Sequence, residues 1–121
     1  MTSAITVDDL PGTCELTIYR ERNWPITFTV LKNGVAMDLT DYEVAAQIRE
    51  GKELDSTIVL TFTASHNDTG GVVTLITTKA VTKEISVSRA WWDLVLTNSS
   101  GYSRTWLEGK VTIKDAPTAL T

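Results

Sequence analysis

The side chains that most often carry out chemistry are few and widely separated in this sequence. His66 is the only histidine and Cys14 the only cysteine, and nucleophilic catalysis would need a nucleophile held next to a base. Residues 65–71 are turn formers, and His66 beside one carboxylate, Asp68, is too small a ligand set for a metal. We therefore predict a solvated turn at His66. Cys14 is predicted to be a buried, inert thiol, with a reactive thiol as the alternative.

Acidic residues and glycines could supply two further chemistries. Four aspartates offer oxygen ligands of the kind that calcium prefers, namely Asp8, Asp9, Asp38 and Asp41. No Asp-x-Asp-x-Asp-Gly loop occurs, however, and aspartate is common in turns because it hydrogen-bonds to nearby backbone. Gly70 and Gly71 precede a strand pattern rather than a helix, so they do not form a phosphate-binding loop. The sequence therefore predicts no enzyme activity, no metal site and no cofactor.

Size and composition set the class of protein. A chain of 121 residues with 42% hydrophobic and 21% charged residues fits one globular domain that can bury a core without disulfides. The net charge of -4 and the scattered basic residues argue against a nucleic-acid partner. No apolar run is long enough for a membrane span, and the first residues lack the pattern of a signal peptide. We expect a soluble protein made in a cytoplasm.

Residues 88–115 carry the clearest structural pattern, which predicts two long strands joined by a turn. Apolar and polar residues alternate with the period of two that places them on opposite faces of a strand. The predicted inward positions are Trp92, Leu94, Leu96, Leu107, Gly109, Val111 and Ile113. Residues 98–101, Asn-Ser-Ser-Gly, are turn formers. Trp92 is thus the largest predicted core residue, while Trp91 and Trp106 are expected on the outer face.

The same alternation predicts strands elsewhere in the chain. Strand patterns cover residues 14–20, 26–31, 57–64 and 72–77, and Asn33 with Gly34 forms a strong hairpin signal. Residues 43–50 alternate strictly and predict a strand, although their helix-forming composition leaves an amphipathic helix as the alternative. Residues 79–85 lack turn formers and predict one or two helical turns, with Ala80, Val81 and Ile85 inward, or else an irregular crossover.

These elements predict an all-β fold, an antiparallel two-sheet Ig-like β-sandwich of about seven to eight strands. A small closed barrel gives similar signals and is the alternative. We expect an N-terminal arm over residues 1–12, the sandwich domain over 13–115 and a C-terminal tail over 116–121. The predicted core contains Phe28, Val30, Tyr42, Val44, Ile48, Leu60, Phe62, Trp92, Leu94, Leu96, Val111 and Ile113.

Four aromatic residues are candidates for contacts with other molecules. They are Trp24, Trp91, Tyr102 and Trp106. An aromatic side chain on the outer face of a strand can simply cover the sheet, or it can anchor a protein interface. In a carbohydrate-binding module, Trp91 or Trp106 would instead form a stacking platform.

Short pieces between residues 24 and 114 carry a family resemblance. They are the strand 26–30, the segment Asp-Leu-Thr-Asp-Tyr at 38–42, Ala-Gln-Ile-Arg at 46–49, Trp-Asp-Leu at 92–94 and the closing strand 109–113. In order and spacing they resemble small bacteriophage virion proteins and modules similar to the N-terminal domain of the baseplate upper protein of phage tails. Asp41 stands where that pattern usually has glycine.

The resemblance implies a non-enzymatic virion structural protein, made in the host cytoplasm, that docks on other virion proteins in the tail, baseplate or fibre. A capsid decoration protein is one alternative, and a carbohydrate- or receptor-binding β-sandwich module is another. We further expect many copies in a symmetric assembly, held by the arm, the tail and exposed strand faces. In a receptor-binding part, the loop tips around Asn33 and Asn67 would face outward.

Overall fold

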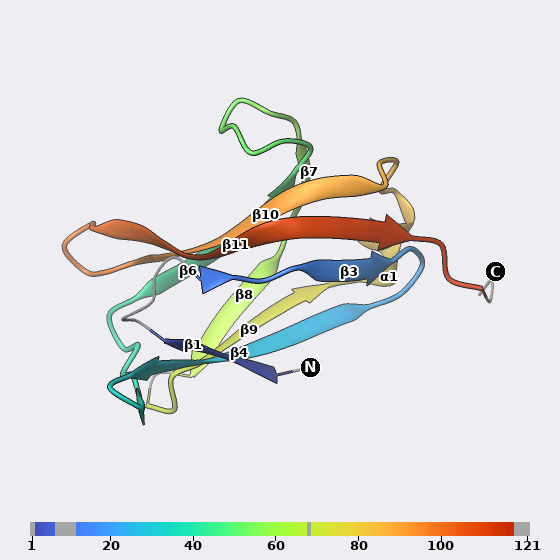
Figure 1. The fold of residues 1–121 in the computed structure, drawn as a ribbon. Coiled ribbons are helices and arrows are strands. Elements are labelled where there is room, and N and C mark those ends of the chain that lie inside the picture. Colours follow the sequence, from blue (N-terminus) through green and yellow to red (C-terminus); the bar gives the residue numbers. More distant parts are fainter. Residues whose placement is uncertain (1, 7–11, 68, 118–121) are drawn as a thin grey trace.

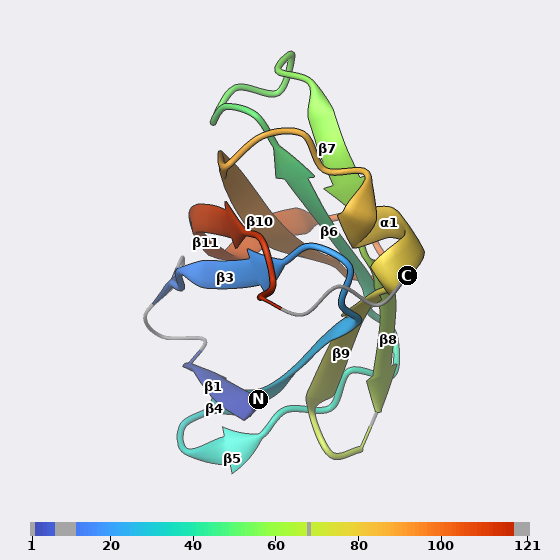
Figure 2. The ribbon, with the colours of Figure 1, turned by 90° about the vertical axis from the view of Figure 1, so that its right-hand side faces the viewer.

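The computed structural model describes residues 2–6, 12–67 and 69–117, and these fold into two facing β-sheets (Figures 1 and 2). The five-stranded sheet contains β1 (Thr2–Thr6), β4 (Trp24–Lys32), β9 (Val72–Thr77) and β8 (Thr63–Asn67) in that order, with β5 (Val35–Ala36) beside β4. The six-stranded sheet contains β2 (Gly12–Thr13) and β3 (Leu16–Tyr19), both along β11 (Ser103–Lys114), followed by β10 (Arg89–Thr97), β6 (Glu43–Arg49) and β7 (Ile58–Thr61). The predicted two-sheet β-sandwich is confirmed.

The strand count and pairing are richer than expected. The described residues form eleven strands, because β1 and the two-residue strands β2 and β5 are added and one predicted strand divides in two. Most pairings are antiparallel, but β1 pairs with β4, and β2 and β3 pair with β11, in parallel. Residues 43–49 form a strand rather than the alternative helix, and Asn33 and Gly34 take the positive φ angles that a tight hairpin turn requires.

The predicted central hairpin is present as β10 and β11, paired from Arg89 opposite Thr112 to Thr97 opposite Ser103. Its register shifts by one residue between Leu94 and Val95, opposite Trp106. Such a β-bulge turns consecutive residues of one strand toward the same side. Trp106 and Leu107 are therefore both buried, and the prediction that Trp106 lies on the outer face is wrong.

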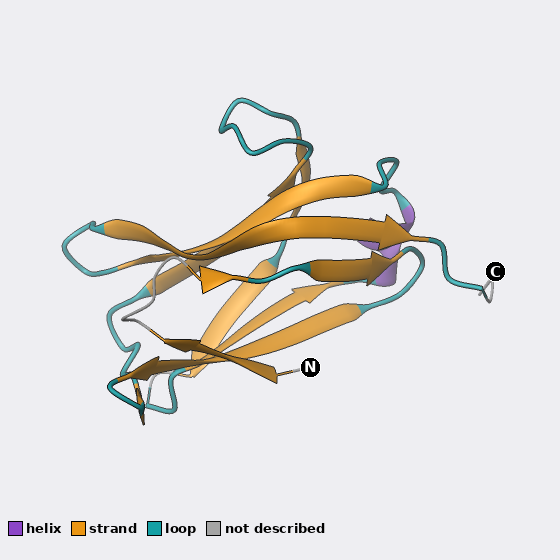
Figure 3. Ribbon diagram, viewed as in Figure 1, coloured by secondary structure: helices purple, strands orange, loops and turns teal. Residues whose placement is uncertain are grey.

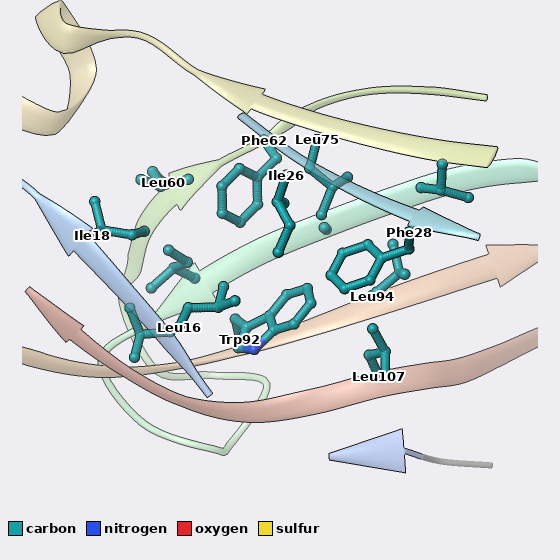
Figure 4. Close-up of a cluster of buried hydrophobic side chains, with 14 of the residues drawn as sticks. Leu16, Ile18, Ile26, Phe28, Leu60, Phe62, Leu75, Trp92, Leu94 and Leu107 are labelled. Atoms are coloured by element: carbon teal, nitrogen blue, oxygen red, sulfur yellow. The ribbon is translucent and has the colours of Figure 1, made fainter. Parts of the chain in front are cut away.

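Trp92 lies at the centre of the core (Figure 4). Its ring stacks on Phe28 with centroids 6.0 Å apart and meets the ring of Phe62 edge-on at 6.5 Å. Its indole nitrogen donates a 2.8 Å hydrogen bond to the backbone oxygen of Cys14. Most of the predicted core is buried, while Tyr42 and Val44 are partly buried at its border.

Gly109 lies beside the segment between β2 and β3, and the predicted strand 14–20 begins only at Leu16. Cys14 lies between β2 and β3 and crosses directly over Gly109, and its backbone nitrogen donates to the oxygen of Glu108 at 2.9 Å. A Cβ atom at position 109 would lie 2.1 Å from the Cys14 oxygen, a distance at which atoms overlap. Glycine is thus required for the close approach of the two backbones, which places the Cys14 oxygen over Trp92.

The predicted strand 57–64 changes sheets at Phe62. Residues 58–61 pair with β6 in one sheet as β7, and residues 63–67 pair with β9 in the other as β8. The backbone nitrogen of Phe62 donates to the oxygen of Ala46 at 3.0 Å, and its side chain is buried between the layers. Ile58, at the start of β7, is exposed. His66 lies opposite Val73 in β8, so the prediction of a turn there is also wrong.

The connection after β9 contains α1 (Lys79–Lys83), which is the helical segment of the described chain (Figure 3). Ile85 is buried as predicted, but Ala80 and Val81 are exposed, and Thr82 is the buried helical residue. The Thr82 hydroxyl donates a hydrogen bond to the backbone oxygen of Arg22 at 2.8 Å. It also accepts one from the backbone nitrogen of Arg22 at 3.2 Å. A buried polar contact, which hydrophobic periodicity does not report, therefore sets the orientation of this helix.

The chain ends differ from the predicted arm and tail. Residues 2–6 of the predicted arm form β1, which pairs with β4 of the same molecule. β11 ends at Lys114, shortly before Pro117. Residues 1 and 7–11 of the predicted arm and 118–121 of the predicted tail lie outside the described residues.

Candidate interaction surface

Two of the four candidate aromatics pack within their own chain. Trp24 is half-buried; its indole nitrogen donates to the oxygen of Thr17 at 3.1 Å, and its ring lies 5.6 Å from that of Phe62. Trp106 is 4% exposed and meets the Tyr42 ring edge-on at 6.0 Å. These rings contribute to the core and its border, which leaves Trp91 and Tyr102 as the accessible aromatic candidates.

Tyr102 is 65% exposed near the tip of the central hairpin. This tip extends beyond the rest of the sandwich, at the end opposite α1 (Figure 1). The side-chain oxygen of Asn98 accepts hydrogen bonds from the backbone nitrogens of Ser100 and Tyr102, both at 3.0 Å. The Asn98 backbone nitrogen in turn donates to the Tyr102 oxygen at 3.0 Å, so the turn is held in one shape and presents the phenol ring on an ordered support.

Trp91 lies on the outer face of the six-stranded sheet, beside a straight row of polar side chains. Cross-strand pairing places the row members opposite one another on five strands, in the order Thr61, Gln47, Asp93, Glu108 and Thr13. Trp91 belongs to the next row, between Arg49 and Lys110. The Nζ atom of Lys52 lies 4.2 Å from the Trp91 ring centroid, and that of Lys110 lies 5.8 Å from it.

A groove of about 640 Å³ runs over these rows. One wall is the loop of residues 50–57 between β6 and β7, which stands out from the sheet in Figure 1. Arg49 donates to the backbone oxygen of Ser56 at 2.7 Å and to the side-chain oxygen of Gln47 at 3.1 Å, while Gln47 donates to the Thr61 hydroxyl at 3.1 Å. The loop wall and the groove floor are thus joined by one hydrogen-bond network.

The Asp93 carboxyl group lies at the centre of this surface, between Gln47 and Glu108. Partial burial raises its pKa, and the facing carboxylate of Glu108 raises it further, while Arg49 acts in the opposite direction. Two acids directly opposite each other on neighbouring strands repel when both are charged. Burial and the facing carboxylate therefore favour the protonated form of Asp93 relative to a free aspartate.

The other residues singled out from the sequence do not come together as a catalytic or metal site. Within the described ranges, no group of three or more histidine, cysteine, aspartate or glutamate side chains could hold a metal ion. Burial raises the pKa of the Cys14 thiol, with a smaller contribution from Glu15, which favours the unreactive protonated form. The carboxylate of Asp38 accepts hydrogen bonds from Thr40, as expected for a turn. No described helix is long and apolar enough to span a membrane.

Sequence reasoning did not identify the groove. Alternation places Gln47, Arg49 and Asp93 on the outer faces of strands, but it does not say which strands are neighbours. The signal for the groove is the pairing of β10 with both β6 and β11, which brings residues 47, 93 and 108 side by side. That order depends on long-range contacts that no local pattern encodes.

The fold and this surface define a two-sheet β-sandwich with a polar groove and a projecting hairpin. No family model matches the sequence, and no curated protein sequence matches it. Among solved structures, the N-terminal domain of phage TP901-1 ORF48 is similar, with a TM-score of 0.57 and 8% sequence identity. The alignment covers 94% of this chain and 99% of that domain. A match at this identity shows a shared fold.

Proposed function

We propose that the chain is a non-enzymatic structural protein of a bacteriophage virion, which attaches to other virion proteins in the tail, baseplate or fibre. The observation that carries the proposal is the end-to-end match with a domain of a phage protein, which covers nearly all of both chains. The residue patterns between 24 and 114, which resemble phage virion modules, support it independently of the backbone comparison.

The projecting tip of β10 and β11 is the proposed docking element. Tyr102 combines a large apolar ring with a hydroxyl group, and aromatic side chains on ordered supports are the usual anchors of protein interfaces. The hydrogen bonds to Asn98 fix the turn before docking, which lowers the entropy cost of binding. Repeated copies in the particle would each present this tip to the same partner surface.

Complementation of a phage that lacks the gene tests the proposal. Particles assembled with the wild-type chain, with Tyr102→Ser or with Val81→Ser are purified, and the copies per particle are counted by quantitative mass spectrometry. Val81 is a matched control because it is an exposed apolar residue on α1, at the other end of the molecule. An anchor worth about 2 kcal/mol corresponds to docking that is about 30-fold weaker when it is removed.

We expect Tyr102→Ser to reduce the copy number strongly and Val81→Ser to leave it unchanged. Full occupancy with Tyr102→Ser would refute the hairpin as the docking element. Absence of the wild-type chain from purified particles would refute the virion role itself.

A further inference from the structure

The groove over the six-stranded sheet has a chemical character that the docking role does not use. Its floor combines hydroxyl groups at both ends with an amide and two adjacent carboxylates between them, so it offers both hydrogen-bond donors and acceptors. Beside this row lies the half-exposed indole of Trp91. On the other side of the row are the small and medium apolar side chains of Ala45 and Val95, which leave the groove open.

The charges of the groove favour a neutral ligand. Three cations, those of Arg49, Lys52 and Lys110, surround Trp91, and two carboxylates, those of Asp93 and Glu108, lie in the next row. An anionic ligand that contacts the cations would lie close to both carboxylates. A cationic ligand that contacts the carboxylates would lie close to the cations. A neutral ligand whose polar groups both donate and accept hydrogen bonds is repelled neither by the carboxylates nor by the cations.

We infer that this groove binds a neutral saccharide. Sugar hydroxyl groups donate and accept hydrogen bonds, and they match a floor where Gln47 and Asp93 lie side by side. The C–H face of a sugar ring is apolar and can pack on the Trp91 indole once the flexible Lys52 side chain, whose Nζ atom lies 4.2 Å from the ring centroid, has moved aside. The groove volume of about 640 Å³ lies within the usual range of small-ligand sites.

Hydrogen bonds that hold the site in one shape support the same inference. The loop wall is bonded to the floor through Arg49, whose guanidinium contacts the Ser56 oxygen and the Gln47 side chain. The side chains of Arg49 and Gln47 are thus oriented before a ligand binds, which reduces the entropy cost of binding. Trp91 would act as the stacking platform, and Asp93 as the acceptor for sugar hydroxyl groups.

Titration of the full chain, labelled with ¹⁵N, tests this site by NMR. The neutral probes are maltose, cellobiose, lactose and N,N′-diacetylchitobiose, and the charged probes are glucuronate and glucosamine. We expect at least one neutral disaccharide to give saturable shifts at the Trp91 indole and at residues 47 and 93, with a dissociation constant on the order of 1 mM. Preference for glucuronate or glucosamine over every neutral probe would overturn the inference.

Variants separate the groove from the rest of the surface. Trp91→Ala should weaken binding about tenfold, since an aromatic contact is worth about one power of ten in affinity. Trp91→Phe keeps a ring and should bind with intermediate affinity, and it serves if the alanine variant fails to fold. Tyr102→Ala is the matched control, because it removes an exposed aromatic residue outside the groove.

Two results would contradict the proposed site. One is the absence of saturable shifts with all four neutral probes at concentrations on the order of 10 mM. The other is binding that Trp91→Ala and Trp91→Phe leave unchanged in folded protein. Because the titration uses the isolated chain, its outcome does not depend on incorporation into particles, so this inference and the virion proposal fail independently.

Discussion

At the scale of single residues, Trp92 lies between the two sheets, among the core side chains drawn in Figure 4. It contacts the rings of Phe28 and Phe62 and satisfies the Cys14 oxygen. Trp92→Ala should lower the free energy of unfolding by about 3–5 kcal/mol, because it leaves a cavity and an unpaired buried carbonyl. Urea denaturation measures the loss. An unaltered unfolding midpoint would contradict this description of the core.

Gly109 makes a second residue-scale prediction. Gly109→Ala should destabilise the domain by more than the ~1 kcal/mol typical of an average substitution, because its Cβ atom would overlap the Cys14 backbone, which cannot rotate away. The control is Gly101→Ala: Gly101 has a positive φ angle but no atom within 4 Å of the added methyl group, so only backbone strain of about 1 kcal/mol is expected. Equal thermal stability of the two variants would contradict the proposed backbone crossing.

Asp93 predicts a pH dependence. Because burial raises its pKa in the folded state, its protonated form favours folding, and this contribution is lost as pH rises from the unfolded-state pKa, about 4, through the raised folded-state pKa. Asp93→Asn removes the titration, so its stability relative to wild type should increase over this pH range and then level off. Chemical denaturation across pH measures the difference.

For Asp38→Asn, we expect the opposite change of relative stability with pH in the same experiment. Hydrogen bonds from Thr40 lower the pKa of Asp38, so its contribution is present above the unfolded-state pKa and is lost as pH falls through the folded-state pKa. The stability of Asp38→Asn relative to wild type should therefore decrease with rising pH. The same pH slope for both variants would contradict the environment assigned to Asp93.

At the residue scale, alternation identified Trp92, Leu94 and Leu96 as buried because a period of two follows directly from strand geometry. It failed at Trp106 because the bulge opposite Leu94 and Val95 interrupts that period without a local sequence signal. Hydrophobic pattern also could not show that Trp24 lies against Phe62, a contact between strands far apart in the chain.

At the scale of elements, Arg20 joins three segments at one end of the sandwich. Its guanidinium donates to the backbone oxygens of Ile85 and Val87, both at 2.8 Å, and pairs with Asp115 at 2.9 Å. Lysine cannot reach all three acceptors, so Arg20→Lys should cost about 1–3 kcal/mol and should increase proteolysis within residues 84–88. Urea denaturation and limited proteolysis measure these effects.

Asp115→Asn is the matched control for Arg20. The Asp115 side chain is 85% exposed, and exposed ion pairs contribute little, so a change within about 0.5 kcal/mol is expected. If Asp115→Asn destabilised the domain as much as Arg20→Lys, the ion pair rather than the two carbonyl contacts would hold this end together.

The presence of most strands could be predicted because the alternation of apolar and polar residues is local. The pairing between strands could not be predicted from it. The change of sheet at Phe62 and the parallel pairing of β3 with β11 depend on contacts between strands that are far apart in the chain. Likewise, β1 finds the edge of β4 although its sequence is short on periodicity, since an open strand edge offers backbone partners to many sequences.

At the scale of the whole molecule, the two proposed surfaces use different parts of the sandwich. The docking tip lies where β10 and β11 project beyond the body, and the groove lies across the middle of the six-stranded sheet. Of these surfaces, the aromatic members Trp91 and Tyr102 could be predicted as exposed candidates. The polar row could not, because it exists only in the assembled order of five strands.

The virion role is tested most directly by quantitative mass spectrometry of density-purified phage particles. We predict that the chain is present at a fixed number of copies relative to the other structural proteins, and that this ratio is the same between preparations and after washing with high salt. A chain that is abundant in the infected-cell lysate but missing from the purified particles, or removed from them by the wash, would contradict the account.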